Sequence, residues 1–182
     1  DEFFELLSRM ADAGCEYVIM EVSSQGLCQY RLGDAYFDVA VFTNLTQDHL
    51  DYHGTMENYL QAKKRLFSMC RTGVVNVDDP YAAQMMAGES CPFVTFAVDD
   101  DRADFVARNV RHRADGVGFE LVGTGHIGRV QMPIPGQFSV YNGLTAAAIC
   151  LAAGMPFDDV VAALCRVHGV KGRAEVVPTG RD

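Results

Sequence analysis

Residues 37–42 read Phe-Asp-Val-Ala-Val-Phe, and a second short apolar run, Tyr-Val-Ile-Met, occupies residues 17–20. Both runs are rich in β-branched or aromatic residues and are bounded by polar segments, so they are predicted to be strands. The stretch that separates them is long enough for a crossover connection, which favours parallel pairing. The pattern therefore predicts an α/β fold, with a mostly parallel open sheet flanked by helices.

The period of the apolar pattern changes near residue 100. Before it, strands are predicted at residues 73–77 and 93–98 with a helix at 79–87 between them, as in a βαβ unit. After it, alternating strands are joined by the turn signals Asp-Gly and Gly-Thr-Gly, and they are predicted to form a small antiparallel three-stranded sheet packed on the main body. These strands span residues 105–113, 117–122 and 127–132. Further helices are predicted at residues 3–13, 139–153 and 157–166.

Polar side chains follow the two apolar runs at the point where each predicted strand ends. Glu21 and Ser23 come directly after the first run, and Asn44 and His49 come after the second. Because the carboxyl ends of parallel strands meet at the edge where open α/β sheets bind ligands, we expect these side chains to lie close together. Carboxylate and imidazole groups are metal ligands, so the edge is a candidate metal or phosphate site.

Lys63 is selected by a different pattern. From Thr55 onward the apolar residues recur at helical spacing, and Lys63 falls on the same face as Met56 and Phe67. A buried amine should have a pKa below the ordinary value of about 10.4 and is nucleophilic when neutral. Its reaction with CO2 would give a carbamate that binds metal as a carboxylate does. The alternative is a lysine whose amine extends past its neighbours to water.

Composition limits the class of protein. The chain has 182 residues, enough for one domain or at most one domain plus part of another, and no apolar stretch approaches the roughly 20 residues of a membrane span. Its first residues lack the pattern of a signal peptide, and its six cysteines form no Cys-x-x-Cys pair, so a cytoplasmic location is expected. A net charge of −9 argues against nucleic-acid and membrane partners.

A family resemblance rests on short segments spread over nearly the whole chain. They are residues 20–27 (MEVSSQGL), 41–45 (VFTNL), 48–57 (DHLDYHGTME), 62–63 (AK) and 172–175 (GRAE). These segments closely resemble the central, ATP-binding domain of Mur ligases of the MurE type. The resemblance implies an ATP-dependent amide-bond ligase that adds meso-diaminopimelate or L-lysine to UDP-N-acetylmuramoyl-L-alanyl-D-glutamate. In that family the reaction passes through an acyl phosphate and uses Mg2+.

The resemblance also implies roles for the three residues of the candidate site. Glu21 and His49 match positions of the magnesium sites around the ATP phosphates. Lys63 matches the lysine that is carbamylated to help hold metal. His49 and Lys63 are therefore the expected catalytic residues. The reaction is expected to need no side-chain nucleophile.

Other positions match the family's substrate contacts. Ser23, Gln29 and Arg31 match residues that contact the UDP-muramoyl-dipeptide. Asn142 resembles an asparagine that meets the nucleotide, and Arg173 resembles an arginine of the ATP site. The family's Phe-Asn-x-x-Asn pattern has Ser139 here in place of its first asparagine.

The expected domain organisation also follows from the resemblance. The chain contains no G-x-x-x-x-G-K-[ST] phosphate loop, which in the family lies upstream of the residues that match here. Residues 1–175 are therefore expected to be a central domain without its phosphate-loop portion, and residues 176–182 the start of a linker. N- and C-terminal domains of the same polypeptide are expected, and the isolated chain is expected to be inactive.

Two other classes compete with the ligase interpretation. Asp48, His49, Asp51 and His53 resemble the cluster of a metal-dependent hydrolase, which would bind zinc or manganese tightly. For His53 itself a local hydrogen bond is favoured over a metal ligand. The second competitor is a noncatalytic scaffold descended from a ligase.

Overall fold

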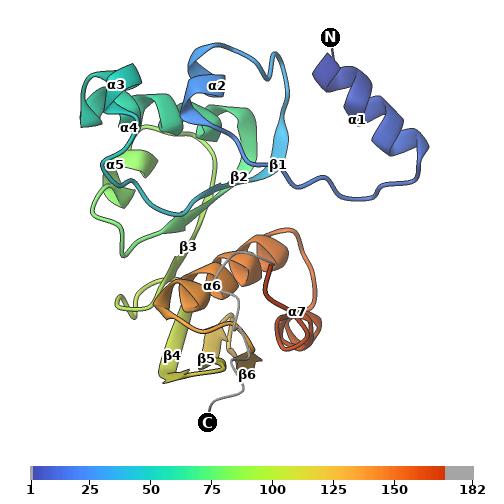
Figure 1. Ribbon diagram of the computed structural model, residues 1–182, viewed down its shortest axis with the longest axis vertical. Helices are drawn as coiled ribbons and strands as arrows, with labels where there is room; N and C mark the ends of the chain where they lie inside the picture. The colour runs from blue at the N-terminus through green and yellow to red at the C-terminus, as the bar shows by residue number, and fades with distance from the viewer. Residues whose placement is uncertain (1, 171–182) are drawn as a thin grey trace, which may run out of the picture.

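A six-stranded sheet runs through the computed structural model, which describes residues 2–170 (Figure 1). The spatial order is the order in the sequence, from β1 to β6. Strands β1 to β4 pair in parallel, and β4 to β6 pair antiparallel. The bounds are β1 Phe37–Phe42, β2 Cys70–Asn76, β3 Phe93–Ala97, β4 Phe105–Arg113, β5 Gly116–Gly123 and β6 His126–Met132. The predicted fold class is thereby confirmed.

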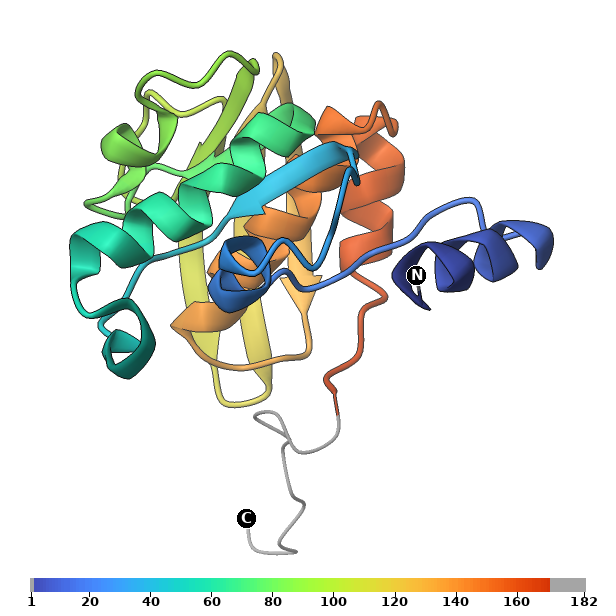
Figure 2. The same cartoon turned by 90° about the horizontal axis from the view of Figure 1, so that it is seen from above.

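Helices cover both faces of the sheet. They are α1 Glu2–Asp12, α2 Ser24–Cys28, α3 Leu50–His53, α4 Met56–Lys64, the 3-10 helix η1 Arg65–Met69, α5 Ala82–Met86, α6 Gln137–Ala152 and α7 Phe157–Leu164. Helix α6 lies across the strands from β1 to β5 with α7 beside it on β6, and α4 lies on the opposite side of β1 (Figure 2). None of the helices in residues 2–170 is both long and apolar enough to cross a membrane.

Strand β1 separates the two cores of the domain. Val39 and Val41 pack into the core that contains α6 and α7. Ala40 and Phe42 pack into the second core, with α4, η1 and α5. Burial on both faces explains why the run at 37–42 is almost continuously apolar, as is typical of parallel strands.

The antiparallel strands continue the main sheet. We expected a small separate sheet, but β4 pairs in parallel with β3 through Phe96 with Phe105 and Ala97 with Val106. The local pattern identified the strands and their turns. For example, Thr124 and Gly125 both have positive φ (51° and 77°), as a two-residue hairpin turn of this twist requires. Which edge the hairpin joins depends on packing against α6, which the local pattern does not encode.

The predicted strand at residues 17–20 is not formed. These residues are irregular and exposed, and Ile19 is 94% accessible. A run of strand-forming residues becomes a strand only when another strand satisfies its backbone hydrogen bonds, and among the described residues β1 pairs with β2 alone. The prediction of a strand here was therefore wrong.

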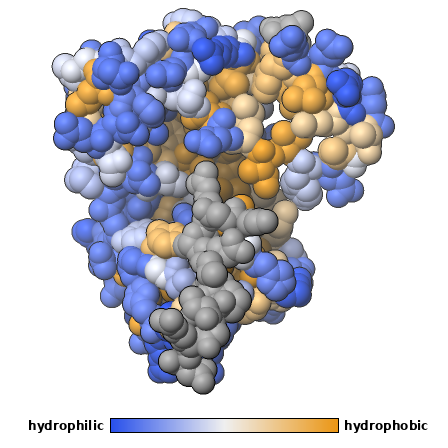
Figure 3. Space-filling model, viewed as in Figure 1, coloured by the Kyte–Doolittle hydropathy of each residue, from blue (hydrophilic) through white to orange (hydrophobic). Residues whose placement is uncertain are grey.

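Helix α1 is formed as predicted and projects from the body (Figures 1 and 2). It ends before Gly14, whose φ of 82° is the left-handed geometry expected after a helix. Although amphipathic, α1 has no buried residue, and apolar surface gathers over this part of the molecule (Figure 3). The predicted domain boundary after residue 175 lies outside the described residues.

Candidate functional site at the carboxyl edge of the sheet

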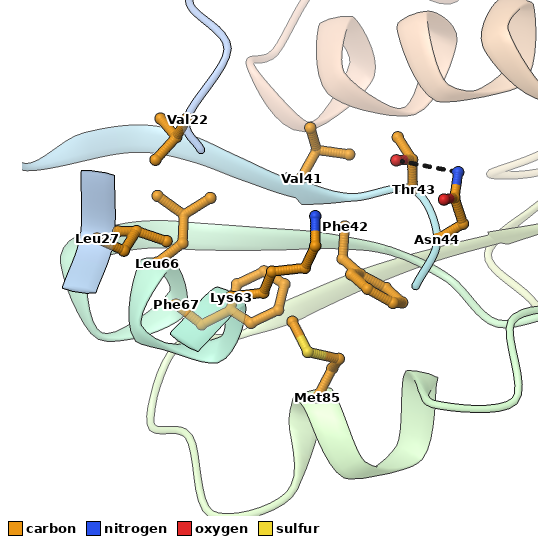
Figure 4. Close-up of a pocket in the computed structure, with 10 residues that line it drawn as sticks. All are labelled: Val22, Leu27, Val41, Phe42, Thr43, Asn44, Lys63, Leu66, Phe67 and Met85. Carbon is orange, nitrogen blue, oxygen red and sulfur yellow. Dashed lines mark hydrogen bonds between the residues drawn. The ribbon is translucent and has the colours of Figure 1, made fainter. Parts of the chain in front are cut away.

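Lys63 reaches from α4 toward the carboxyl end of β1 and borders a small cavity (Figure 4). The cavity has a volume of about 50 Å³ and is lined by apolar groups of Phe42, Leu66 and Met85, with Thr43 and Asn44 at the end of β1. A buried water needs roughly 10–15 Å³. The cavity therefore has room for a small molecule beside the lysine amine.

Two opposing effects act on the pKa of the Lys63 amine. Burial lowers the pKa of its amine below the ordinary value, while the carboxylates of Glu21, Asp48 and Asp79 oppose that shift. The predicted lowering of the pKa by burial is thus confirmed in direction. The residue is half-buried and borders the cavity at the carboxyl end of β1.

His49 stands in a strained backbone conformation just before α3. Its φ is 53° and its ψ is 25°, the left-handed region that few residues with a side chain adopt. Its N–H donates to Asp48 Oδ1 at 2.7 Å, and its Nε2 lies 3.5 Å from Asp48 Oδ2. The ring itself is exposed. Strain of this kind is concentrated at functional sites, so the observation adds weight to the sequence-based choice of His49.

The loop that carries His49 is anchored by residues that sequence reasoning missed. Asn76 Nδ2 donates to the carbonyl oxygen of Thr43 at 2.9 Å, and Leu45 N–H donates to Asp79 Oδ2 at 2.9 Å. Asn76 is the last residue of β2 and Asp79 follows that strand, so both lie at the same edge of the sheet. The rule that located Glu21 and His49, polar residues at the carboxyl end of a parallel strand, also applies to them.

Helix α2 presents the residues expected to contact the muramoyl substrate. Ser23 caps the helix by accepting a hydrogen bond from Gly26 N–H at 3.0 Å. Gln29 and Arg31 follow the helix, and both are exposed. Gln29 Nε2 donates to the hydroxyl of Tyr52 at 3.3 Å, which links α2 to α3. The structure therefore gathers these three residues on one short segment next to Glu21.

His53 is buried and forms a hydrogen bond with a residue that is distant in the sequence. Its Nε2 is 2.9 Å from Ser24 Oγ, a partner 29 residues away, and its ring stacks on Tyr59. Burial, with smaller contributions from His49 and Lys63, lowers the pKa of His53. We expected a hydrogen bond rather than a metal ligand, which is what the structure contains, but the expectation of a local partner was wrong.

The candidate nucleotide contacts lie on α6 and beyond. Asn142 is exposed, and its neighbour Tyr141 donates its hydroxyl to Asp78 Oδ2 at 3.0 Å. Burial and this contact raise the pKa of Tyr141. Ser139 is buried and donates to the carbonyl oxygen of Pro135 at 2.9 Å, so it does not share the exposure of Asn142. Arg173 lies outside the described residues.

The hydrolase alternative is not supported. Within residues 2–170, no three His, Cys, Asp or Glu side chains lie together in a way that would hold a metal ion. Of the four proposed ligands, His53 is buried with its Nε2 on Ser24, whereas Asp48, His49 and Asp51 are exposed. The cluster read from the sequence is therefore not assembled in space.

Comparisons with known proteins agree on one family. The family model described as Mur ligase middle domain matches residues 2–150. A UDP-N-acetylmuramoyl-L-alanyl-D-glutamate–2,6-diaminopimelate ligase from Bacillus licheniformis is 41% identical over 96% of this chain and 37% of that protein. A ligase of the same name from Geobacillus kaustophilus is 42% identical over 96% of this chain and 37% of its own length.

Solved structures give the same result for the fold. The structure of a UDP-N-acetylmuramoyl-L-alanyl-D-glutamate–2,6-diaminopimelate ligase aligns with a TM-score of 0.78 and 33% identity, over 89% of this chain and 34% of that one. A crystal structure of MurF from Acinetobacter baumannii, at 24% identity and a TM-score of 0.70, shares the fold over 77% of this chain and 31% of its own. The chain thus spans little more than a third of the length of the curated relatives it matches.

Proposed function

Since the chain belongs to the Mur ligase family, we propose that it forms part of an ATP-dependent ligase that adds a diamino acid to UDP-N-acetylmuramoyl-L-alanyl-D-glutamate. The names of the relatives favour 2,6-diaminopimelate over L-lysine as that amino acid. ATP would phosphorylate the terminal carboxylate of the dipeptide, and the incoming amine would then displace phosphate from the acyl phosphate. We propose that the reaction takes place in the cytoplasm.

The observation that carries the proposal is the position of Lys63. Lys63 is half-buried, burial lowers the pKa of its amine, and it borders a cavity of about 50 Å³ at the carboxyl edge of the sheet. A neutral amine attacks the carbon of CO2, a new N–C bond forms and one proton is released. The product is a carbamate anion. We infer that Lys63 carries this modification in the working enzyme.

The residues around Lys63 fit a magnesium ion once that change is made. As an ammonium, Lys63 is a positive charge among the carboxylates of Glu21, Asp48 and Asp79 and would repel a cation. As a carbamate it adds an anionic oxygen donor, the ligand type that Mg2+ prefers. Glu21, His49 and carbamylated Lys63 would hold the ion. Once bound, Mg2+ would offset the negative charge of the phosphates and of the substrate carboxylate.

The remaining site residues have roles in binding. Ser23, Gln29 and Arg31 would contact the muramoyl-dipeptide from the segment around α2, with the Arg31 guanidinium suited to an anionic group. Asn142 and Arg173 would contact the nucleotide. These contacts hold the two anionic substrates in place, which is the main contribution a protein makes to phosphoryl transfer.

Carbamylation is testable on the chain itself, because the sequence has only three lysines, Lys63, Lys64 and Lys171. In 13C-bicarbonate, the NMR spectrum of the purified chain is expected to contain a carbamate resonance that disappears in Lys63→Arg. Lys64→Arg is the matched control, because Lys64 instead pairs with Glu89 at 3.7 Å. Persistence of that same resonance in Lys63→Arg would remove the basis of the proposed metal site.

Ligase activity requires a complete enzyme. The corresponding region of the Bacillus licheniformis relative is therefore replaced by residues 2–150 of this chain. Amide formation is then measured with ATP, UDP-N-acetylmuramoyl-L-alanyl-D-glutamate and 2,6-diaminopimelate. The hybrid is expected to be active, and Lys63→Arg or Glu21→Gln is expected to reduce its turnover at least a hundredfold. A folded hybrid whose turnover is unaffected by both substitutions would contradict the assigned roles.

A further inference from the structure

A chain of side-chain contacts connects α2 to Lys63. Ser24 Oγ lies 2.9 Å from His53 Nε2, and the His53 ring stacks on the ring of Tyr59 with centroids 4.8 Å apart and an interplanar angle of 16°. Lys63 Nζ in turn lies 5.1 Å from the centroid of the Tyr59 ring. Ser24, His53 and Tyr59 are all buried. The contact chain therefore crosses three helices, α2, α3 and α4, and ends at the amine.

The segment that leads into α2 is held by apolar packing of Val22 and Leu27 at the cavity and by a few polar contacts. Glu21, three residues before Ser24, belongs to an exposed and irregular stretch that forms no strand. Two further side-chain contacts join the end of α2 to the neighbouring helices, from Gln29 to Tyr52 and from Tyr30 to Arg65, and both involve exposed residues. Of these three side-chain contacts, the one between Ser24 and His53 is buried. It fixes the start of α2, and with it the end of the segment that carries Glu21.

The ring of Tyr59 lies next to two of the proposed metal ligands, His49 and Lys63. Besides stacking on His53 and lying below Lys63, its ring meets His49 edge to face with centroids 6.0 Å apart. Tyr59 and Lys63 are four residues apart on α4, so the helix places one above the other. The Lys63 amine lies over this ring, and the Lys63 side chain borders the cavity by the end of β1 (Figure 4).

We propose that Ser24, His53 and Tyr59 are positioning residues that hold the Lys63 amine and the Glu21 segment in register for metal binding. This inference rests on the proposed function, because it concerns the same site. The hydrogen bond sets the position of α2 against α3, and the stacked rings transmit that position to Lys63. None of the three residues needs to touch metal or substrate.

The experiment uses the 182-residue chain labelled with 13C-lysine. Tyr59→Leu removes the ring, and Tyr59→Phe, which keeps it, is the matched control. Ser24→Ala removes the hydroxyl, and Ser24→Thr keeps one. Two quantities are measured at fixed pH and bicarbonate under conditions where each variant is folded by circular dichroism: the order of the Lys63 side chain from 13Cε relaxation, and the fraction of Lys63 present as carbamate.

Tyr59→Leu and Ser24→Ala are expected to lower the carbamate fraction at least threefold and to increase the mobility of the Lys63 side chain, while Tyr59→Phe and Ser24→Thr retain wild-type values. If both disruptive variants lose thermal stability but keep wild-type Lys63 order and carbamate, the three residues only support the fold and the inference is overturned. If Tyr59→Leu does not fold, Ser24→Ala decides alone. Absence of carbamate in the wild-type chain would count against the proposed function, and the relaxation measurement would still decide the positioning role.

Discussion

Asp79 Oδ2 accepts a hydrogen bond from the backbone N–H of Leu45 at 2.9 Å, so a carboxylate that follows β2 holds the loop that follows β1. Its other oxygen, Oδ1, accepts from Tyr81 N–H at 2.9 Å near the start of α5. One side chain therefore fixes two neighbouring connections at the edge of the sheet where the candidate site lies.

Asp79→Ala is expected to lower the free energy of unfolding by about 2 kcal/mol, because two backbone donors lose a charged acceptor. Hydrogen exchange at the Leu45 amide should accelerate more than exchange in β5, which lies far from Asp79. Asp79→Asn keeps one acceptor oxygen and should lose less stability. Unchanged exchange at Leu45 in Asp79→Ala would show that the loop is held by other contacts.

Tyr141→Phe is expected to cost about 1 kcal/mol at neutral pH through loss of the hydrogen bond to Asp78. Because the pKa of Tyr141 is raised in the folded state, the tyrosine stays neutral there while the unfolded chain ionises above about pH 10. The stability advantage of wild type over Tyr141→Phe should therefore be complete below pH 10 and shrink above it. Urea denaturation at pH 7 and pH 10.5 measures the difference, and an advantage that grows with pH would contradict this reasoning.

Lys63→Met is expected to raise the melting temperature in CO2-free buffer at pH 7. The pKa of Lys63 is lowered by burial, so the wild-type protein carries an unfavourable charge at neutral pH. That penalty is present below the folded-state pKa and disappears as the pH rises to the unfolded value of about 10.4, because the unfolded chain then binds no more protons than the folded one. The gain in melting temperature should shrink accordingly. A lower melting temperature at pH 7 would mean that the amine makes a net favourable contribution.

Gly73→Ala is expected to destabilise the domain by about 1–3 kcal/mol through overpacking. A Cβ at this position in β2 would lie 2.5 Å from Cε1 of Phe93 and 3.0 Å from Cε1 of Phe67, and both rings belong to the core. Gly169→Ala is the control, because a Cβ there would come no nearer than 3.9 Å, to Ile134. Equal denaturation midpoints for the two variants would show that the rings move aside at little cost.

The purified chain is expected to release no ADP from ATP above the uncatalysed background, with or without Mg2+. The 182 residues contain no G-x-x-x-x-G-K-[ST] loop, whose backbone N–H groups and lysine would hold the phosphates. Coupled-enzyme detection of ADP provides the measurement. Turnover that is lost in Lys63→Arg would disprove this expectation, whereas turnover that persists in that variant would indicate a contaminating ATPase.

The local sequence pattern was sufficient to predict an element whose formation depends mainly on its own residues. The run at 37–42 became a strand with the predicted bounds, since both of its faces are buried. The run at 17–20 has similar residues but no pairing strand, and pairing is a tertiary property that a pattern does not contain. The connection of β4 to β3 was missed for the same reason.

In the candidate site, too, the local sequence pattern predicted some features and tertiary structure determined the others. Lys63 was found because a charged residue on an apolar helical face is a local anomaly, and Glu21 and His49 because they follow predicted strands. The contact of Ser24 with His53 and that of Asp79 with Leu45 join residues 29 and 34 positions apart. Only folding places such pairs side by side, so the supporting contacts of the site emerged from the structure.

The left-handed backbone at His49 has a practical consequence for engineering this domain. Glycine is the residue that adopts a φ of 53° without steric cost, so a routine stabilisation scheme would choose His49→Gly. That choice would relax the chain and delete the imidazole that we propose as a metal ligand. The backbone conformation at position 49 favours glycine, whereas the proposed chemistry requires histidine. A stabilised version of this protein should therefore keep His49.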